Sequence, residues 1–173
     1  MNNNWRGILK IVEATHTRDG NIIWKANDMY NLLHSQGEQY ILETLFYNDG
    51  TSPPSAYYLG LDARPTIAYA DTMSSLIGEP TTNGYSRQPL NSSSSGSTGW
   101  TITTEASLHK ALSNVVSFTA SGGSYGPCYN LFLTNKSNNT GKLISSVALS
   151  TPATLSSGDV LSLRMTLSLK DCP

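Results

Sequence analysis

The sequence predicts a mainly β protein of the α+β class, an antiparallel β-sandwich or jelly-roll-like domain with two short helices in its N-terminal half. Residues 160–170 (VLSLRMTLSLK) alternate apolar and polar side chains, which places the two kinds on opposite faces of a strand. After residue 84, turn-forming clusters recur about every ten residues, a spacing typical of the short strands of sandwiches and barrels. Helical spacing of apolar residues is found in the N-terminal half, so the helices are expected there.

Length and composition favour one domain over residues 1–173 with a neutral polar surface. A chain of 173 residues can bury a proper core and rarely needs a second domain. Only 13% of the residues are charged and the net charge is -1, so Ser, Thr and Asn must keep the protein in solution. The 11 basic residues are scattered, which argues against a nucleic-acid partner.

We expect a protein made in the cytosol, with no membrane partner. No apolar stretch approaches the roughly 18 residues that a membrane helix needs. The first ten residues, MNNNWRGILK, lack the long apolar run of a secretion signal.

The first element is expected to be a β-hairpin over about residues 6–26. Two β-prone runs, RGILKIVEATHT and IIWKA, lie on either side of Asp19-Gly20. Tight hairpin turns need positive φ at their central positions, which Asp and Gly tolerate. The hairpin must then find a larger sheet to join.

The first helix is expected over about residues 36–47. Ser35 and Glu38 match a capping box, in which each side chain accepts a hydrogen bond from a free backbone amide of the first turn. Asn48-Asp49-Gly50 provides the stop signal. Apolar residues share one helical face, namely Ile41, Leu42, Leu45 and Phe46. We expect this face to be buried against the sheet.

A second helix is expected over about residues 67–77. Thr66 could cap it, while Gly78 and Pro80 would end it. Its apolar side would consist of Ile67, Ala70, Met73 and Ile77. Between the two helices, YYLGL is expected to form a short strand.

A C-terminal β region is expected over about residues 84–170. GYSRQPL could be an edge strand, because Pro89 cannot donate a hydrogen bond to a neighbouring strand. The following segment, residues 91–99, is low-complexity and expected to be flexible. The remaining strands are expected at WTITTEA, NVVSFTA, CYNLFLT, KLISSVALS and the closing run, whereas HKALSN stays open.

The sequence predicts no catalytic, cofactor-binding or metal-binding residues, and we expect no enzyme. Gly122 to Gly126 matches the G-x-S-x-G elbow of α/β hydrolases around Ser124. That elbow requires a helix after it and a histidine further along the chain, but a β-like run follows and every histidine lies upstream. We therefore interpret the match as a glycine-rich loop between strands. The histidines lack metal-ligand spacing, and His34 is expected to be an ordinary surface group.

Cys128 and Cys172 are the only cysteines, too few for a disulfide scaffold or a zinc site. Cys128 is expected to be a buried thiol, and pairing with Cys172 stays an alternative.

The segments NLLHSQGEQYILETLFYNDG and SPPSAYYLGLD, together with the Gly84-Tyr85 and Gly158-Asp159 regions, resemble virion proteins of tailed bacteriophages. Within that group the chain resembles head decoration, or cement, proteins. The resemblance implies a jelly-roll-like fold, a homotrimer, the major capsid protein as partner and a place on the capsid surface of the virion. It brings no catalytic residues.

The function expected is therefore structural: decoration and stabilisation of a phage capsid by an oligomer bound to its outer surface. Candidate contacts with the capsid or with other subunits are Trp5, Arg6, Tyr85, Arg87 and Arg164.

The alternative function is a receptor- or carbohydrate-binding head of a phage tail. Exposed aromatic side chains at Tyr85, Tyr125 and Tyr129 would then form the platform for a sugar. A third interpretation, a hydrolase acting through Ser124, would need an upstream histidine as its base.

Overall fold

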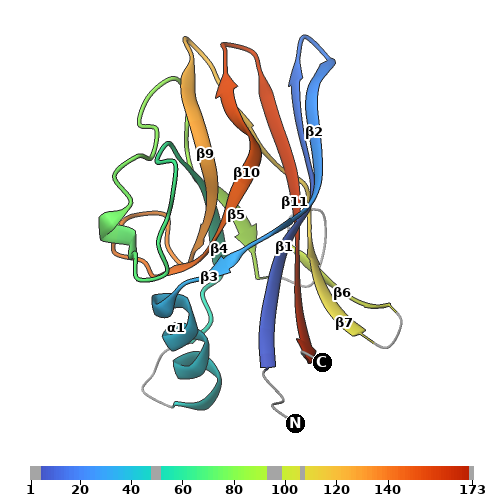
Figure 1. The fold of residues 1–173 in the computed structure, drawn as a ribbon, viewed down its shortest axis with the longest axis vertical. Helices are drawn as coiled ribbons and strands as arrows, with labels where there is room; N and C mark the ends of the chain where they lie inside the picture. Colours follow the sequence, from blue (N-terminus) through green and yellow to red (C-terminus); the bar gives the residue numbers. More distant parts are fainter. Residues whose placement is uncertain (1–4, 48–51, 93–98, 106–107, 172–173) are drawn as a thin grey trace.

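The computed structural model describes residues 5–47, 52–92, 99–105 and 108–171, and the side chains of all of these except 5–12, 105, 108 and 169–171. Two antiparallel sheets face one another, so the predicted β-sandwich is confirmed (Figure 1). Nearly all of the chain after residue 84 alternates between strands and short connections, as the turn spacing predicts. No helix in the described residues is both long and apolar enough to cross a membrane.

The spatial order of the strands shows how distant parts of the chain meet. The first sheet runs β2 (Asn21–Tyr30), β1 (Trp5–Arg18), β11 (Val160–Asp171), β7 (Leu108–Ser113) and β6 (Trp100–Glu105), and β8 (Val116–Thr119) also pairs with β11. The second sheet runs β3 (Leu32–Leu33), β10 (Leu143–Leu155), β9 (Tyr125–Thr134), β4 (Ala56–Asp62) and β5 (Gln88–Asn91). The first and last strands are thus neighbours in the middle of one sheet.

The predicted hairpin joins β1 to β2. Asp19 and Gly20 have positive φ angles of 49° and 78°, as a tight turn of this kind requires. Arg18 pairs with Asn21 directly across the turn. The larger sheet that the hairpin joins is reached through β1, which pairs with β11 over most of its length.

The alternating closing strand is β11, and its apolar face points into the sandwich. Leu161, Leu163 and Met165 are buried in the main core. On the other face, Ser162 and Arg164 are half-buried. Leu167 continues the apolar row but is exposed, so the core does not extend to the end of the strand.

The main core lies between the two sheets, and a smaller second core lies on the outer face of the second sheet. The second core contains Phe132 and Leu143 from β9 and β10, covered by Ile67, Met73 and Leu76. Gly60 of β4 makes room for it, because a Cβ there would lie 2.2 Å from the Phe132 ring. Both faces of the second sheet are therefore partly covered.

The first predicted helix is present as α1, Ser35–Phe46. Its N-cap is His34 and no side chain caps the helix, so the predicted capping box of Ser35 and Glu38 is wrong. The Glu38 carboxylate instead accepts a hydrogen bond from the Tyr69 hydroxyl at 2.8 Å.

The predicted second helix over residues 67–77 is wrong. The segment is an irregular loop with one 3₁₀ turn, η1 (Met73–Ser75). Asp71 accepts a hydrogen bond from the Ala68 amide, and Ser75 forms hydrogen bonds with the Thr72 backbone. Short polar side chains that bond to nearby backbone groups compete with a helix, and here they win. Ile67, Met73 and Leu76 of the loop are still buried in a core, on the outside of β9 and β10, whereas Ile77 is exposed.

The predicted strands YYLGL and GYSRQPL correspond to β4 and to β5, an edge strand that contains Pro89. The open segment HKALSN belongs to β7. Most of the loop expected to be flexible, residues 93–98, lies outside the described residues.

Candidate interaction surface

The N-terminal half of α1 is fixed to the second sheet. The His34 amide donates to the Ile144 carbonyl at 3.0 Å, and the Leu143 amide donates to the Gln36 side chain at 2.6 Å. Gly37 allows the close approach, because a Cβ at this position would lie 2.2 Å from the Ile144 carbonyl oxygen. Tyr40, one turn further along, points into the main core.

His34 is part of this attachment and not a surface group, so the sequence-based expectation for it is wrong. Its ring is fully buried, and Nε2 lies 2.8 Å from the Ser146 hydroxyl. Burial lowers the pKa of His34 below its ordinary value. The residue therefore acts as a neutral hydrogen-bonding group at the junction of β3 and α1.

The C-terminal half of α1 is free of the sheet. Leu42, Leu45, Phe46 and Tyr47 are 58%, 64%, 81% and 66% exposed. The prediction that Ile41, Leu42, Leu45 and Phe46 form a buried face is therefore wrong, and only Ile41 is half-buried. The residues that the helix buries are instead Gly37 and Tyr40, in its N-terminal half.

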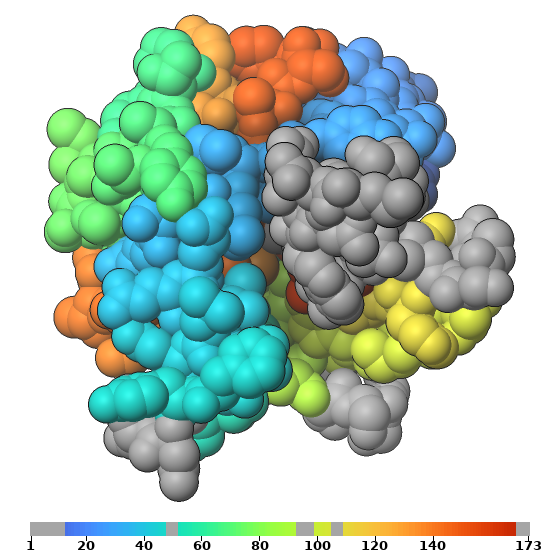
Figure 2. All heavy atoms as spheres, turned by 60° about the horizontal axis from the view of Figure 1, so that its bottom comes forward, coloured from blue at the N-terminus to red at the C-terminus, as the bar shows by residue number. Residues whose placement is uncertain are grey.

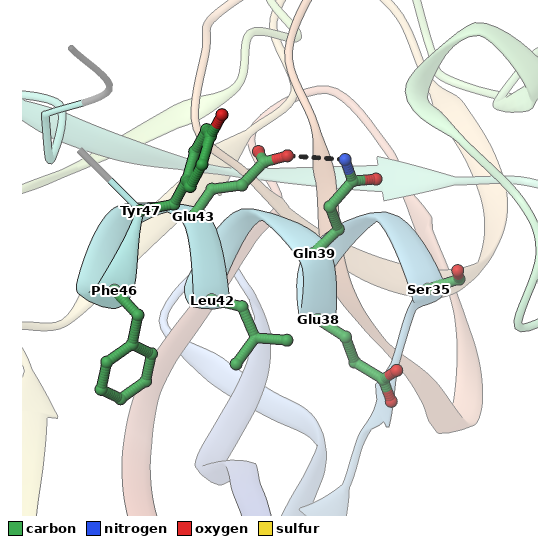
Figure 3. A pocket seen from close by; sticks show the side chains of 7 residues that line it. All are labelled: Ser35, Glu38, Gln39, Leu42, Glu43, Phe46 and Tyr47. Carbon is green, nitrogen blue, oxygen red and sulfur yellow. Dashed lines mark hydrogen bonds between the residues drawn. The ribbon is translucent and has the colours of Figure 1, made fainter. Parts of the chain in front are cut away.

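A shallow groove of about 540 Å³ runs along the exposed side of α1 (Figure 3). Figure 3 shows Glu38, Leu42 and Phe46 pointing to one side of the helix, one turn apart. Gln39, Glu43 and Tyr47 point to the other side, and the Gln39 amide donates to Glu43 at 2.6 Å. We call the side chains of Leu42, Leu45, Phe46 and Tyr47 the helix patch.

Acidic groups border the helix patch. Glu38 lies in the first turn, Glu43 lies beside the groove, and the last turn contains no basic residue. A positive charge near the C-terminus of a helix stabilises it through the helix dipole, and α1 lacks such a charge in its last turn. The surface is therefore apolar at its centre and negative at its edge.

The helix patch lies at the same end of the molecule as the β6–β7 hairpin (Figure 1). Viewed toward this end, α1 in cyan and the described part of the β6–β7 hairpin in yellow lie on opposite sides (Figure 2). Between them is a cavity of about 420 Å³. Its walls come from α1 and both sheets and include Tyr40, Leu45, Trp100, Ile102 and Leu167.

Two of the predicted contact residues, Tyr85 and Arg87, form internal contacts. The Tyr85 hydroxyl accepts a hydrogen bond from the Leu61 amide at 2.9 Å and donates one to Glu79 at 2.7 Å. Burial, and then the neighbouring Glu79 charge, raise the pKa of Tyr85. The Arg87 guanidinium binds both oxygens of the same Glu79, at 2.8 and 2.6 Å, and lies over the Phe132 ring.

The other three predicted contacts are on the first sheet. Arg164 is half-buried on β11, opposite Glu13 of β1. Trp5 and Arg6 begin β1, where they pair with Asp171 and Lys170, and their side chains lie outside the described residues.

The proposed sugar platform of Tyr85, Tyr125 and Tyr129 is not an exposed aromatic surface. Tyr85 stacks on Phe118 with 5.9 Å between ring centroids, and Tyr125 meets Tyr85 edge-on at 5.6 Å. Tyr125 is buried and Tyr129 is half-buried. The rings of Tyr85 and Tyr125 belong to the main core, which is the commonest place for large aromatic side chains.

The segment from Gly122 to Gly126 connects β8 to β9, and the strand begins at Tyr125 directly after Ser124. This is the loop between strands that the sequence predicts. Among the described residues, no three His, Cys, Asp or Glu side chains come together as a metal site. Cys128 is a buried free thiol, whose pKa burial raises to about 12, and Cys172 lies outside the described residues.

Sequence reasoning missed the helix patch, although one signal for it was present. A glycine inside a helix usually has a packing reason, and Gly37 marks the side that approaches the sheet. Tyr40 follows at i+3 on that side, whereas Leu42 and Phe46 lie one turn apart on the other side of the helix and so face away from the sheet.

A family model described as Podophage GP4 fiber I protein gp80 matches residues 33–167. This range includes α1, the second sheet and most of β11. Searches of curated proteins and of solved structures found no match.

Proposed function

The chain belongs to the Podophage GP4 fiber I protein gp80 family and is a phage virion structural protein, and from this premise we propose that it is a fiber subunit that joins other subunits through the helix patch. In this proposal the protein works by binding and assembly, without catalysis. The family description names a fiber, which supports a place in a fiber over the decoration of the capsid that the sequence resemblance implied.

The observation that carries the proposal is the exposure of four large apolar side chains on the end of α1 and its C-cap residue Tyr47, within residues 42–47. Single exposed apolar residues are ordinary on protein surfaces, but contiguous ones mark sites of interaction. Full burial of such a side chain contributes about 1.5–3 kcal/mol. Four of them can offset much of the roughly 4–15 kcal/mol that association costs in lost freedom of motion.

We propose a homotrimer as the assembled form. The net charge of -1 leaves little repulsion between copies. The edge strands β6 and β5 also offer unpaired backbone groups to a neighbour. A closed cyclic assembly would cover these apolar and backbone groups in every copy equally.

The test is sedimentation equilibrium of the purified chain and of two variants. The double variant Leu42→Ser/Phe46→Ser should shift the equilibrium from trimer to monomer. Ile77→Ser is the matched control, because Ile77 is 84% exposed but lies on the loop that covers the second sheet. A wild-type chain that remains monomeric, or a double variant that assembles like wild type, would contradict the proposal.

A second measurement separates a fiber from capsid decoration. Purified protein is mixed with phage capsids that lack both fibers and decoration proteins, and the particles are sedimented. We expect the protein to stay in the supernatant. Saturable binding over the capsid surface would favour the decoration function, with the major capsid protein as partner.

A further inference from the structure

The cavity between α1 and the β6–β7 hairpin has an apolar wall built by strand register. Ile102 of β6 pairs with Ala111 of β7, and Ala111 pairs with Leu167 of β11. Residues that pair across neighbouring strands point to the same face, so these three form one row. All three line the cavity of about 420 Å³.

The opposite wall is also uncharged, but it contains two buried hydroxyl groups. The described residues of the lining include no Asp, Glu, Lys or Arg. Ser145 of β10 is fully buried, and its hydroxyl has no hydrogen-bond partner among the described residues. The hydroxyl of Tyr40, whose side chain is 4% exposed, also lacks a well-formed hydrogen bond among the described residues, and its polar neighbour there is the Tyr57 phenol.

A cavity with these properties is unusual for a space left by imperfect packing. Protein interiors seldom contain voids much larger than a water molecule. Buried hydroxyl groups normally have partners, and each group left without one destabilises the fold. A space lined by apolar side chains with a few placed polar groups, and with a volume of about 300–1,000 Å³, is typical of small-molecule sites.

We propose that this cavity binds a neutral, mainly apolar small molecule that carries a carbonyl or hydroxyl oxygen. The lining, as far as the structure describes it, offers no partner to an anion or cation, and a charge taken out of water needs one. The oxygen of the ligand would accept hydrogen bonds from Ser145 and Tyr40. The apolar body would lie against the row of Ile102, Ala111 and Leu167. Leu45 belongs both to the helix patch and to the cavity lining, but Leu42 and Phe46, which the assembly test changes, do not line the cavity, so the two proposals can be tested separately.

The neighbouring Tyr57 supports a dry site. Its ring meets Tyr40 edge-on with 6.5 Å between centroids, and it also lines the cavity. Burial, and then the adjacent Tyr40 phenol, raise the pKa of Tyr57. The Tyr57 phenol therefore stays protonated over the ordinary pH range and can donate a hydrogen bond.

The test uses prodan, a neutral naphthalene ketone whose emission shifts to the blue in apolar surroundings. Titration of the full chain should show saturable binding with that shift. Trp100 lines the cavity, so bound prodan should quench tryptophan emission by energy transfer. Most of this quenching should disappear in Trp100→Phe, while the other two tryptophans remain.

Variants locate the probe. Ala111→Phe fills the middle of the apolar row and should weaken binding at least about tenfold. Thr103→Phe is the matched control, because Thr103 is exposed and, as the next residue on β6, points to the other face of the strand. This variant should bind prodan within about twofold of wild type. Leu45→Trp is a second blocking variant, which serves if Ala111→Phe fails to fold. Leu45 is an exposed residue of the lining, so this variant blocks the cavity without disturbing the core and should also weaken binding.

Ser145→Ala tests the class of ligand. Loss of one hydrogen bond should weaken prodan binding about two- to tenfold. Binding of prodan that Ala111→Phe and Leu45→Trp leave unchanged would overturn the site. Unchanged binding by Ser145→Ala would overturn the assigned ligand chemistry. The assembly variant Leu42→Ser/Phe46→Ser should bind prodan like wild type, so failure of either proposal can be recognised separately.

Discussion

Truncation of two aromatic side chains on α1 should change the free energy of unfolding by very different amounts. Phe46 is 81% exposed and Tyr40 is 4% exposed, although both lie on a helix of 12 residues. Phe46→Ala removes side-chain area that is already in water, so the free energy of unfolding should change by less than about 0.5 kcal/mol. Tyr40→Ala opens a cavity in the main core and should cost about 3–5 kcal/mol.

The assay is urea unfolding followed by circular dichroism, at a protein concentration low enough to keep the chain monomeric. Tyr40→Phe is the control for Tyr40→Ala, since it keeps the ring and removes only the hydroxyl. That hydroxyl has no well-formed hydrogen bond among the described residues, so Tyr40→Phe should lose far less stability than Tyr40→Ala. If Phe46→Ala lost 3 kcal/mol or more as a monomer, the helix would pack through the face that the periodicity of the sequence favours. The proposed helix patch would then be refuted.

Three further predictions concern the groups that hold the sandwich together, and urea unfolding measures each. Hydrogen bonds from Arg18 hold the pKa of Asp159 well below its usual range. The carboxylate therefore adds stability above about pH 4, and this stability is lost as the pH falls further. The stability of Asp159→Asn should depend less on acid pH, and an unchanged pH dependence would contradict this role of Asp159. Gly37→Ala should cost at least about 1–3 kcal/mol, because the clash of its Cβ with β10 outweighs the roughly 1 kcal/mol that alanine adds to a helix; a more stable variant would contradict the close approach. Tyr85→Phe should cost about 1–3 kcal/mol, because it leaves the Leu61 amide without its acceptor, and a neutral result would show that this amide has another partner.

The strands could be predicted from the sequence because their patterns have short periods and clear stops. The Asp19-Gly20 turn fixes the first hairpin, and the alternation after residue 160 fixes the last strand. Pro89 correctly indicates an edge strand at β5. In each case the signal lies in residues that are close in the sequence, and the structure adds only which strands pair in the sheet.

The orientation of α1 could not be predicted in the same way. Helical periodicity shows that a helix has an apolar side, but it does not show whether another part of the chain covers that side. Here the contacts that decide come from Gly37 and Tyr40, which meet β10 and the core. The second predicted helix failed for a related reason. Only Ile67 and Met73 of its predicted apolar side are buried, and they pack around Phe132 and Leu143, which lie far away in the sequence.

The closing strand shows how one uniform pattern can serve two purposes. β8 pairs with β11 over Val160–Leu163 and β7 pairs with it over Thr166–Ser168. Beside β8 the sheets close over a packed core, whereas beside β7 the cavity separates the first sheet from α1. The apolar row of β11 therefore passes from buried positions, ending at Met165, to the exposed Leu167 at the cavity wall. The apolar pattern continues past the point where the chain can cover it, and it meets the uncovered end of α1 there. The exposed apolar residues at this end of the molecule thus look, by sequence, like ordinary core.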